Sequence, residues 1–332
     1  MISMADPCSE GDNGQSAYGD CISESPGQAA LTGIPVEPID IRSVVRRMRG
    51  GSQAYLVEGS DGRFYVAKFT GNPQGNRTLI NECVAYHLLQ QLQVSTPALR
   101  ILRLSEEIRD KAGLCFSVGE RTISVQPGLH LGSQCPVNPT TTAIFDFLPR
   151  KLLPNVINLG DFAKAFVVDK LLGQTDARQC IFVRDRLDKT GLAFRAYMID
   201  HGWIFAANRW EFQDCSRFGL YLDSTVYSML DMLSQCRQIV EIVRRTDESG
   251  FYAAATNIPS TWFAESDYDG LVNVFTTLVN RVARLDSLIS YHLGAIVSKR
   301  DQAVDAGAGN AAGNAYQRDS CTPNLRIAPE TC

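Results

Sequence analysis

Apolar residues first alternate with polar ones and later recur at helical spacing, so the chain predicts strands in its first part and helices in its second. Alternation with a period of two is the pattern of half-buried strands, and turn residues separate the alternating runs. The predicted strands of the first part occupy residues 55–57, 64–69, 98–104 and 114–118. An apolar stripe predicts a helix over residues 77–92, and its members are Ile80, Val84, Leu88 and Leu89 or Leu92.

The second part of the chain is predicted to be mainly helical. Helical spacing starts at Thr140, includes Ile144 and Phe145, and stops at Pro149. Asp161 is the predicted N-cap of the next helix. The two helices after it are amphipathic. These three predicted helices occupy residues 162–172, 223–245 and 268–298.

Size and composition set limits on the folded body. A chain of 332 residues with 45% hydrophobic residues can bury one large core or two lobes that share a cleft. Residues 1–36 are rich in Gly, Ser, Asp and Pro and hold few bulky apolar side chains, and residues 303–332 have the same character. Such segments bury too little apolar surface to offset the entropy of ordering them. We therefore expect two disordered tails around a folded body over residues 37–302.

Charge and cysteine usage exclude several classes of function. The net charge of −4 argues against direct nucleic-acid binding, because such domains usually need a basic face. The first residues lack the basic start and apolar core of a signal peptide, and no run approaches the roughly 18 apolar residues of a membrane span. The ten cysteines form no Cys-x-x-Cys pair, so we expect buried thiols and no zinc site. These features predict a soluble, cytoplasmic protein without a membrane partner.

Two aspartates, Asp176 and Asp200, lie in contexts suited to phosphoryl transfer. Asp176 ends a Gly-Gln-Thr-Asp turn after an apolar run, where an exposed carboxylate can meet a substrate hydroxyl. Asp200 ends an alternating strand, so its carboxylate is placed to hold a magnesium ion. For either residue alone, a turn residue or a strand-end cap is the competing interpretation. Strands predicted at residues 180–184 and 193–199 flank a turn at residues 188–191, and this hairpin would bring Asp200 close to Asp176.

These aspartate contexts resemble motifs of the HipA-like kinases and, more distantly, of the phosphatidylinositol kinases. The catalytic loop of these families begins with Asp, here in Thr-Asp-Ala-Arg-Gln at residues 175–179, and a later Ile-Asp-x-Gly metal motif is matched at residues 199–202. The family loops usually carry His and Asn two and five residues after the first Asp, where this chain has Arg178 and Ile181. A subgroup of HipA-like domains with Asp-x-Arg-Gln before an apolar strand is more similar. That subgroup also carries a run like the Gly-Asn-Pro-Gln-Gly at residues 71–75.

The resemblance implies a two-lobed, protein-kinase-like α+β fold with ATP and magnesium in the cleft between the lobes. The small, mostly β N-lobe would span residues 37–133, and the larger, mostly helical C-lobe would span residues 134–302. The hinge, whose backbone would hydrogen-bond the adenine ring, is expected within residues 126–134. The loop whose backbone amides would approach the phosphates consists of Gly50, Gly51, Ser52 and Gln53.

The same resemblance gives four charged residues roles in catalysis. Lys68, in a Val-Ala-Lys-Phe strand, would contact the α- and β-phosphates, and Glu82 on the following helix would hold it there. Asp200 would hold magnesium between the outer phosphates. Asp176 would orient the attacking hydroxyl. The competing interpretation of Lys68 is a solvated lysine, and that of Glu82 is an ordinary helix glutamate. Both interpretations are less favoured because the two residues occur together with Asp176 and Asp200.

Three further positions leave the function open. Gln179 is the candidate for a second magnesium contact in place of the missing asparagine, and Arg178 is a candidate contact to phosphate or to the acceptor. Ile181 stands at the asparagine position and motivates the alternative of a pseudokinase that binds nucleotide or a protein partner without transfer. A small-molecule phosphotransferase is a third hypothesis, because the catalytic residues do not distinguish a protein Ser/Thr from another hydroxyl acceptor.

Overall fold

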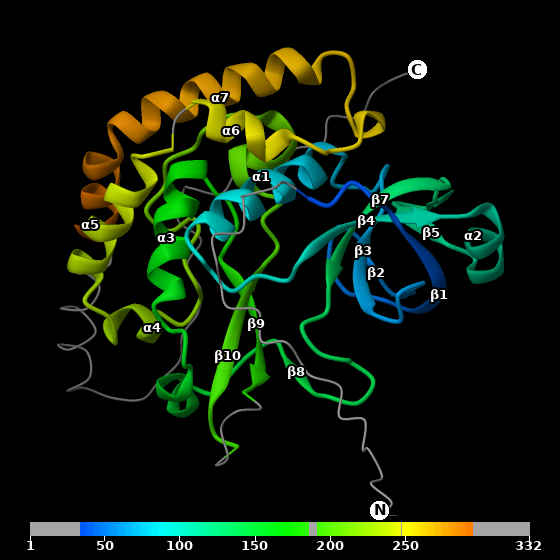
Figure 1. Ribbon diagram of the computed structural model, residues 1–332, viewed down its shortest axis with the longest axis horizontal. Coiled ribbons are helices and arrows are strands. Elements are labelled where there is room, and N and C mark those ends of the chain that lie inside the picture. The colour runs from blue at the N-terminus through cyan, green and yellow to red at the C-terminus, as the bar shows by residue number, and fades with distance from the viewer. Residues whose placement is uncertain (1–33, 186–190, 247, 295–332) are drawn as a thin grey trace, which may run out of the picture. The chain divides into compact units, whose positions relative to one another are not determined.

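The first part of the chain folds into a closed barrel with the strand order β1-β2-β3-β7-β4 (Figure 1). The computed structural model describes residues 34–185, 191–246 and 248–294. Neighbouring barrel strands are antiparallel, except that β1 and β4 pair in parallel. The barrel strands are β1 (Ile39–Arg47), β2 (Tyr55–Gly59), β3 (Phe64–Lys68), β4 (Leu99–Leu104) and β7 (Gly128–Gln134).

Alternation along β2 and β3 sends every second side chain into the barrel. Tyr55 and Val57 of β2 are buried in the barrel core, and so are Tyr65 and Ala67 of β3. Because successive side chains of a strand point to opposite faces, the last residue of β3, Lys68, points away from this core. The period of the strand therefore directs the lysine toward the helical part of the protein.

Helix α1 (Arg77–Gln91) is buried on almost all sides because it lies between the barrel and the remaining helices (Figure 1). It contacts α3 (Asp161–Leu172) and α6 (Glu248–Ala255), and its apolar side chains belong to the main hydrophobic core. A surface helix would bury only one stripe. Burial on all sides also encloses polar residues of α1, among them Asn81 and Glu82, which are 0% and 4% exposed.

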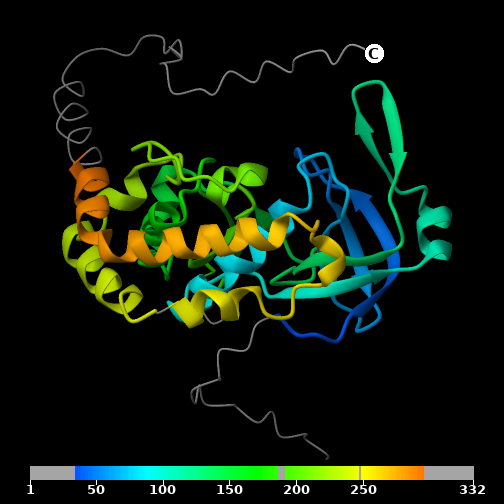
Figure 2. The same ribbon diagram turned by 90° about the horizontal axis from the view of Figure 1, so that it is seen from above.

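A short helix and a hairpin lie between β4 and β7. Helix α2 (Glu106–Ala112) begins after its N-cap Ser105, whose hydroxyl accepts a hydrogen bond from the Ile108 amide. Strands β5 (Cys115–Val118) and β6 (Arg121–Ser124) pair antiparallel, and Figure 2 shows this hairpin projecting from the barrel.

The second part combines helices with a three-stranded sheet in the order β10-β9-β8. Helix α7 packs on α3 and α6 and lies across them (Figure 2). Each helix of the described residues is too short or too polar to cross a membrane. The remaining elements of this part are β8 (Ile144–Phe145), η1 (Arg150–Asn155), β9 (Gln179–Arg184), β10 (Phe194–Ile199), η2 (Ile204–Arg209), α4 (Thr225–Ser228), α5 (Met232–Val243), η3 (Ser260–Trp262) and α7 (Asp267–Ala283).

The predicted α+β fold class, with a strand-rich first part and a helical second part, is confirmed, but some predicted helices differ. The helix predicted from Thr140 is wrong, because Ile144 and Phe145 form β8 and pair with β9. The helix predicted over residues 223–245 is two helices, since Asp231 starts α5 by accepting a hydrogen bond from the Ser234 amide.

The last predicted helix and the predicted tails reach the limits of the described chain. The helix predicted over residues 268–298 is interrupted, because α7 ends at Ala283 and helical structure resumes over residues 285–294. Four parts of the predictions lie outside the described residues: residues 295–298 of that helix, residues 188–190 of the predicted turn, residues 1–33 of the first tail and the whole second tail. Ile34, predicted to belong to the first tail, is buried in the main core, and its carbonyl accepts a hydrogen bond from Asn257. Ordered chain therefore begins before residue 36.

Candidate active site

A cavity of about 1030 Å³ lies between the barrel and the β8-β9-β10 sheet. This volume lies at the upper end of the range for small-molecule sites. Its apolar walls come from both parts of the protein, and they include Leu56, Val66, Leu131, Ile181 and Ile199. Its charged and amide side chains include Lys68, Glu82, Asp176, Gln179 and Asp200. The structure thus brings the five predicted catalytic and metal residues to one cavity.

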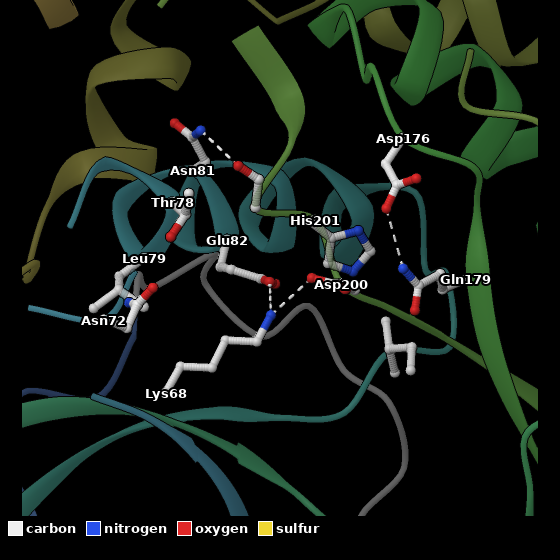
Figure 3. A network of polar contacts seen from close by, with 12 residues as sticks. Lys68, Asn72, Thr78, Leu79, Asn81, Glu82, Asp176, Gln179, Asp200 and His201 are labelled. Carbon is white, nitrogen blue, oxygen red and sulfur yellow. Dashed lines mark hydrogen bonds and ion pairs between the residues drawn. The ribbon is translucent and has the colours of Figure 1, made fainter. Parts of the chain in front are cut away.

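Lys68 lies between two carboxylates from different parts of the chain (Figure 3). Its Nζ is 2.5 Å from Glu82 Oε1 on α1 and 2.8 Å from Asp200 Oδ1 beyond β10. Burial alone would lower the pKa of Lys68, but the negative charges of Glu82 and Asp200 outweigh burial and raise it. The positive charge of Lys68 lowers the pKa of Asp200 in turn, against the opposing effect of burial. Both side chains are therefore charged at neutral pH.

The backbone of Asp200 turns its carboxylate off the end of β10. Its φ of +59° lies in the left-handed region, which Asp tolerates better than most residues. Gln174 Nε2 donates a hydrogen bond to the Asp200 carbonyl at 3.3 Å. A left-handed residue that ends a strand in a cavity is a strained position of the kind that collects at functional sites.

Asn81 holds the segment that follows Asp200. Its Nδ2 donates to the carbonyls of Gly202, Ile204 and Ala207 at 2.9, 3.0 and 3.1 Å, and its Oδ1 accepts from Trp210 Nε1 at 2.9 Å. Figure 3 shows Asn81 one residue before Glu82 on the same helix. Helix α1 therefore positions both the partner of Lys68 and the loop that carries Asp200.

Gly202 lets this loop approach α1 closely. A Cβ on Gly202 would lie 3.3 Å from the Thr78 carbonyl and 3.6 Å from Glu82 Oε1. The glycine of the Ile-Asp-x-Gly motif thus allows close packing against the helix that carries Glu82, where a larger residue would need the helix to shift.

Asp176 and Gln179 lie at the end of the β9-β10 hairpin that also carries Asp200. Gln179 Nε2 donates to Asp176 Oδ2 at 3.2 Å, and the Ala177 amide donates to Asp176 Oδ1 at 2.8 Å (Figure 3). In the strand register Gln179 pairs with Ile199, the residue before Asp200. The predicted hairpin is confirmed, and its register places the amide of Gln179 at the same sheet end as the Asp200 carboxylate.

The turn before Asp176 is bonded to the loop after Asp200. Thr175 donates to the Trp203 carbonyl through its hydroxyl at 3.0 Å and through its amide at 3.1 Å. With the contact from Gln174 to Asp200, these bonds fix the two aspartate loops to each other.

Arg178 does not line the cavity, so its predicted contact with phosphate or acceptor is wrong. The side chain is 1% exposed and forms a two-point ion pair with Asp169 of α3, in which Arg178 Nε lies 2.8 Å from Asp169 Oδ2. Arg178 Nη1 also donates to the Ile199 carbonyl and to His201 Nδ1, both at 2.9 Å. Burial, followed by the charge of Arg178, lowers the pKa of His201 well below its usual value, so a neutral imidazole accepts this hydrogen bond. Because all of these acceptors lie within the protein, Arg178 links α3 to the two aspartate loops and has a structural role.

The predicted phosphate loop faces the cavity only in part. Gly50, Gly51 and Ser52 line it. Gln53 does not, because its side chain pairs with the backbone of Ser117 in the projecting hairpin. Gln53 Nε2 donates to the Ser117 carbonyl at 2.7 Å, and the Ser117 amide donates to Gln53 Oε1 at 2.8 Å.

The segment predicted as the hinge is mostly a barrel strand. β7 pairs with β3 on one side and β4 on the other, so its backbone groups are used within the sheet. Gln134, Cys135 and Pro136 at the end of this strand line the cavity. At the end of the strand, the backbone amides of Gln134 and Cys135 donate to the carbonyls of Ala98 and Phe64 at 2.9 and 2.8 Å, so the hinge stays a prediction.

A family match bears on the first part of this site. Residues 41–123 match the HipA-like kinase family. The matched stretch contains the glycine loop, Lys68 and Glu82, whereas Asp176 and Asp200 lie beyond it. The resemblance to HipA-like kinases is thereby confirmed, and the distant resemblance to phosphatidylinositol kinases stays a prediction.

Solved structures of kinases are similar to the chain at low sequence identity. The proinflammatory kinase CtkA of Helicobacter pylori is 14% identical, with a TM-score of 0.45 over 77% of this chain and 99% of CtkA. The Golgi casein kinase is 13% identical, with a TM-score of 0.37 over 77% of this chain and 74% of that protein. Its structure with Mn/ADP bound is 14% identical, with a TM-score of 0.39 and the same coverage. No curated protein matches the chain in sequence.

Several residues that build the site were missed in the sequence. Asn81 had a weak signal, because it is next to the stripe residue Ile80 and three residues before the stripe residue Val84, which places it at the edge of the apolar stripe. Asp169 had a similar signal within the apolar run of α3. Gln174 and Thr175 carry no signal beyond their place before Asp176, because their partners are backbone carbonyls 26 and 28 residues away.

Proposed function

We propose that the protein is an ATP- and magnesium-dependent phosphotransferase that acts on a hydroxyl acceptor, with a protein Ser/Thr as one candidate. The observation that carries this proposal is the contact of Lys68 with both Glu82 and Asp200 in a cavity that Asp176 also lines. A lysine held by a helix carboxylate next to a metal-binding aspartate is the arrangement that kinases use on nucleotide phosphates. Lys68 and Glu82 lie in a stretch that matches HipA-like kinases, and this match supports the same chemistry.

In this proposal the nucleotide base lies among the apolar walls and the triphosphate lies at Lys68. Leu56 and Val66 would pack on one side of the base, and Ile181 and Ile199 on the other. Ile181 therefore has a binding role of its own on β9, at a position where the family usually carries a metal-binding asparagine.

The residues at the phosphate end fit a magnesium ion that keeps water and phosphate among its ligands. No group of three or more His, Cys, Asp and Glu among the described residues could hold a metal alone. Magnesium in phosphotransferases often takes only one or two carboxylates, with substrate phosphates completing its coordination. Asp200 would supply the carboxylate and Gln179 an amide oxygen. Bound magnesium would offset the negative charge of the outer phosphates.

Asp176 would act on the acceptor hydroxyl. The acceptor oxygen would form a bond to the γ-phosphorus while the bond from that phosphorus to the β,γ-bridging oxygen breaks, and ADP would leave with that oxygen. Asp176 would orient the hydroxyl and accept its proton. Its hydrogen bonds from Ala177 and Gln179 hold the carboxylate in one orientation without burying it.

A nucleotide-binding pseudokinase is the second candidate, and Ile181 favours it. The cavity offers an amide from Gln179 in place of the usual asparagine, and this exchange could support binding without transfer. Both candidates predict nucleotide binding, so only a measurement of turnover distinguishes them.

The decisive experiment is incubation of the purified protein with γ-labelled ATP and magnesium, followed by intact mass measurement. We expect ADP to form, and label on the protein itself would identify a protein hydroxyl acceptor. Lys68→Met should lower transfer by roughly 10²-fold or more, because the cation that offsets phosphate charge is removed. It should also weaken the rise in melting temperature that ATP and magnesium cause. Nucleotide binding without ADP formation under any divalent metal would favour the pseudokinase, and an undiminished ATP effect in Lys68→Met would contradict the assignment of the lysine.

The role of Gln179 is tested by the magnesium dependence of transfer. Gln179→Leu removes the amide oxygen and should raise the magnesium concentration for half-maximal activity severalfold. Gln179→Asn keeps a shorter amide and should raise it less. Gln126→Leu, at an exposed glutamine outside the cavity, is the matched control. Equal magnesium dependence in all three variants and the unchanged protein would remove Gln179 from the metal site.

A further inference from the structure

A second loop meets the glycine loop at the cavity, and the roles above leave it without a function. Residues 71–76 connect β3 to α1, and Gln74 of this loop lines the cavity together with Lys68 and Asp200. Its side chain lies against the glycine loop, because a Cβ on Gly51 would be only 2.8 Å from Gln74 Nε2. The absence of a side chain at Gly51 therefore makes room for the Gln74 amide.

The backbone of this loop is held rigidly. Asn72 is 3% exposed, and its Nδ2 donates to the Phe69 carbonyl while its Oδ1 accepts from the Gln74 amide, both at 2.9 Å. The Gly75 amide donates to the Asn72 carbonyl at 2.8 Å, and Asn208 Nδ2 donates to the Gln74 carbonyl. Both backbone polar groups of Gln74 are thus occupied, which fixes the point of the loop from which its side chain extends.

The side-chain amide of Gln74 has no such partner. Among residues 34–185, 191–246 and 248–294, nothing donates to or accepts from it, and the backbone N–H groups of Gly51 and Ser52 are likewise unbonded. The amide of Gln74, the backbone of Gly51 and Ser52 and the cation of Lys68 all line the same cavity, and Gln74 Nε2 lies next to Gly51. Several donors that share a cavity with a fixed positive charge suit an anion with several oxygens.

We propose that Gln74 is a phosphate-binding residue that donates hydrogen bonds from Nε2 to the outer phosphates of the nucleotide, beside the N–H groups of Gly51 and Ser52. This inference rests on the proposed function, because it names the residue that recognises the phosphate end of the same nucleotide. The proposal also assigns roles to two residues of the Gly-Asn-Pro-Gln-Gly run. Asn72 stabilises the loop through its side-chain hydrogen bonds, and Gln74 would contact the nucleotide.

The test is equilibrium binding of ATP with magnesium and, separately, of adenosine. Gln74→Ala should weaken ATP binding by about 10-fold, the effect of losing a hydrogen bond to a charged group. Gln74→Glu should weaken it more, because a carboxylate would repel the phosphates. Adenosine affinity should stay within about twofold in both variants, since adenosine has no phosphate. Gln126→Ala is the control glutamine and should change neither affinity.

Substitution of Gly51 gives a second, independent test of the same inference. Gly51→Ala places a Cβ against the amide of Gln74, so it should also weaken ATP binding and spare adenosine. In the Gln74→Ala background the same substitution should have little further effect, because the side chain it displaces is already absent.

Three results would overturn the inference, and they separate its failure from that of the proposed function. If Lys68→Met weakens ATP binding and Gln74→Ala does not, Gln74 is not a phosphate ligand and the proposed function stands. Equal loss of ATP and adenosine affinity in Gln74→Ala would show that the glutamine only shapes the cavity. If the unchanged protein binds neither ATP nor inorganic tripolyphosphate, the proposed function and this inference fail together.

Discussion

Asp176→Asn is expected to lower phosphoryl transfer by roughly 10²- to 10⁴-fold while nucleotide binding stays nearly intact. The asparagine keeps the shape of the side chain and can accept one of the two hydrogen bonds that Asp176 accepts, but it cannot accept the proton of the acceptor hydroxyl. Because Asp176 makes no contact with Lys68, the rise in melting temperature with ATP and magnesium should be preserved. Turnover and the melting-temperature shift are measured on the same preparation.

Asp200→Asn should weaken both phosphoryl transfer and nucleotide binding. Asp200 is the carboxylate proposed to hold magnesium, and its Oδ1 is also 2.8 Å from Lys68 Nζ, so its neutralisation disturbs the metal and the cation together. The comparison of the two variants is the test, since each is the control for the other. Loss of ATP binding in Asp176→Asn with normal binding in Asp200→Asn would reverse the two assignments and contradict the proposed mechanism.

Arg178→Met is expected to destabilise the protein by about 3–5 kcal/mol, the usual cost of leaving one partner of a buried ion pair without the other. Asp169 would remain with its charge in a site where it is 2% exposed. Burial raises the pKa of Asp169 and the charge of Arg178 opposes this, so loss of Arg178 should also raise that pKa further. Unfolding in denaturant at neutral pH measures the free energy of unfolding.

Two variants show whether the ion pair is the cause. Arg184→Met, at an exposed arginine at the end of β9, the strand that follows Arg178, should change the free energy of unfolding by no more than about 0.5 kcal/mol. Asp169→Leu combined with Arg178→Met removes both charges and should recover part of the lost stability. If Arg178→Met is as stable as Arg184→Met, the tie between α3 and the aspartate loops is not structural, and a ligand-binding role for Arg178 returns.

The pattern of the sequence was sufficient for the side-chain directions on β2 and β3 and for the hairpin of β9 and β10. Alternation with a period of two assigns Tyr65 and Lys68 to opposite faces of β3 without knowledge of any other segment. The family resemblance could be recognised because its residues are contiguous in short runs. The candidate charged residues followed from these local signals, and the structure places them at one cavity.

Strands β1 and β8 could not be predicted in the same way. β1 carries Arg42, Arg46 and Arg47 and so lacks a clear alternating pattern, and it becomes a strand because β2 and β4 pair with it on either side. Ile144 and Phe145 have the spacing of a helix and form a strand because β9 offers an open edge. In both places the partner is distant in sequence, and a local pattern carries no information about it.

By itself the sequence determined which residues have the chemistry for phosphoryl transfer and which face of a strand carries Lys68. Only the tertiary structure decided where the other polar groups go. It buries Arg178 against Asp169 and places Gln74 next to Gly51. It also places Asn81 where its amide donates to the loop that follows Asp200. The physical reason is that a local pattern of apolar and polar residues predicts only which side chains are buried. The hydrogen-bond partner of a buried polar group depends on packing between segments that can lie more than 100 residues apart.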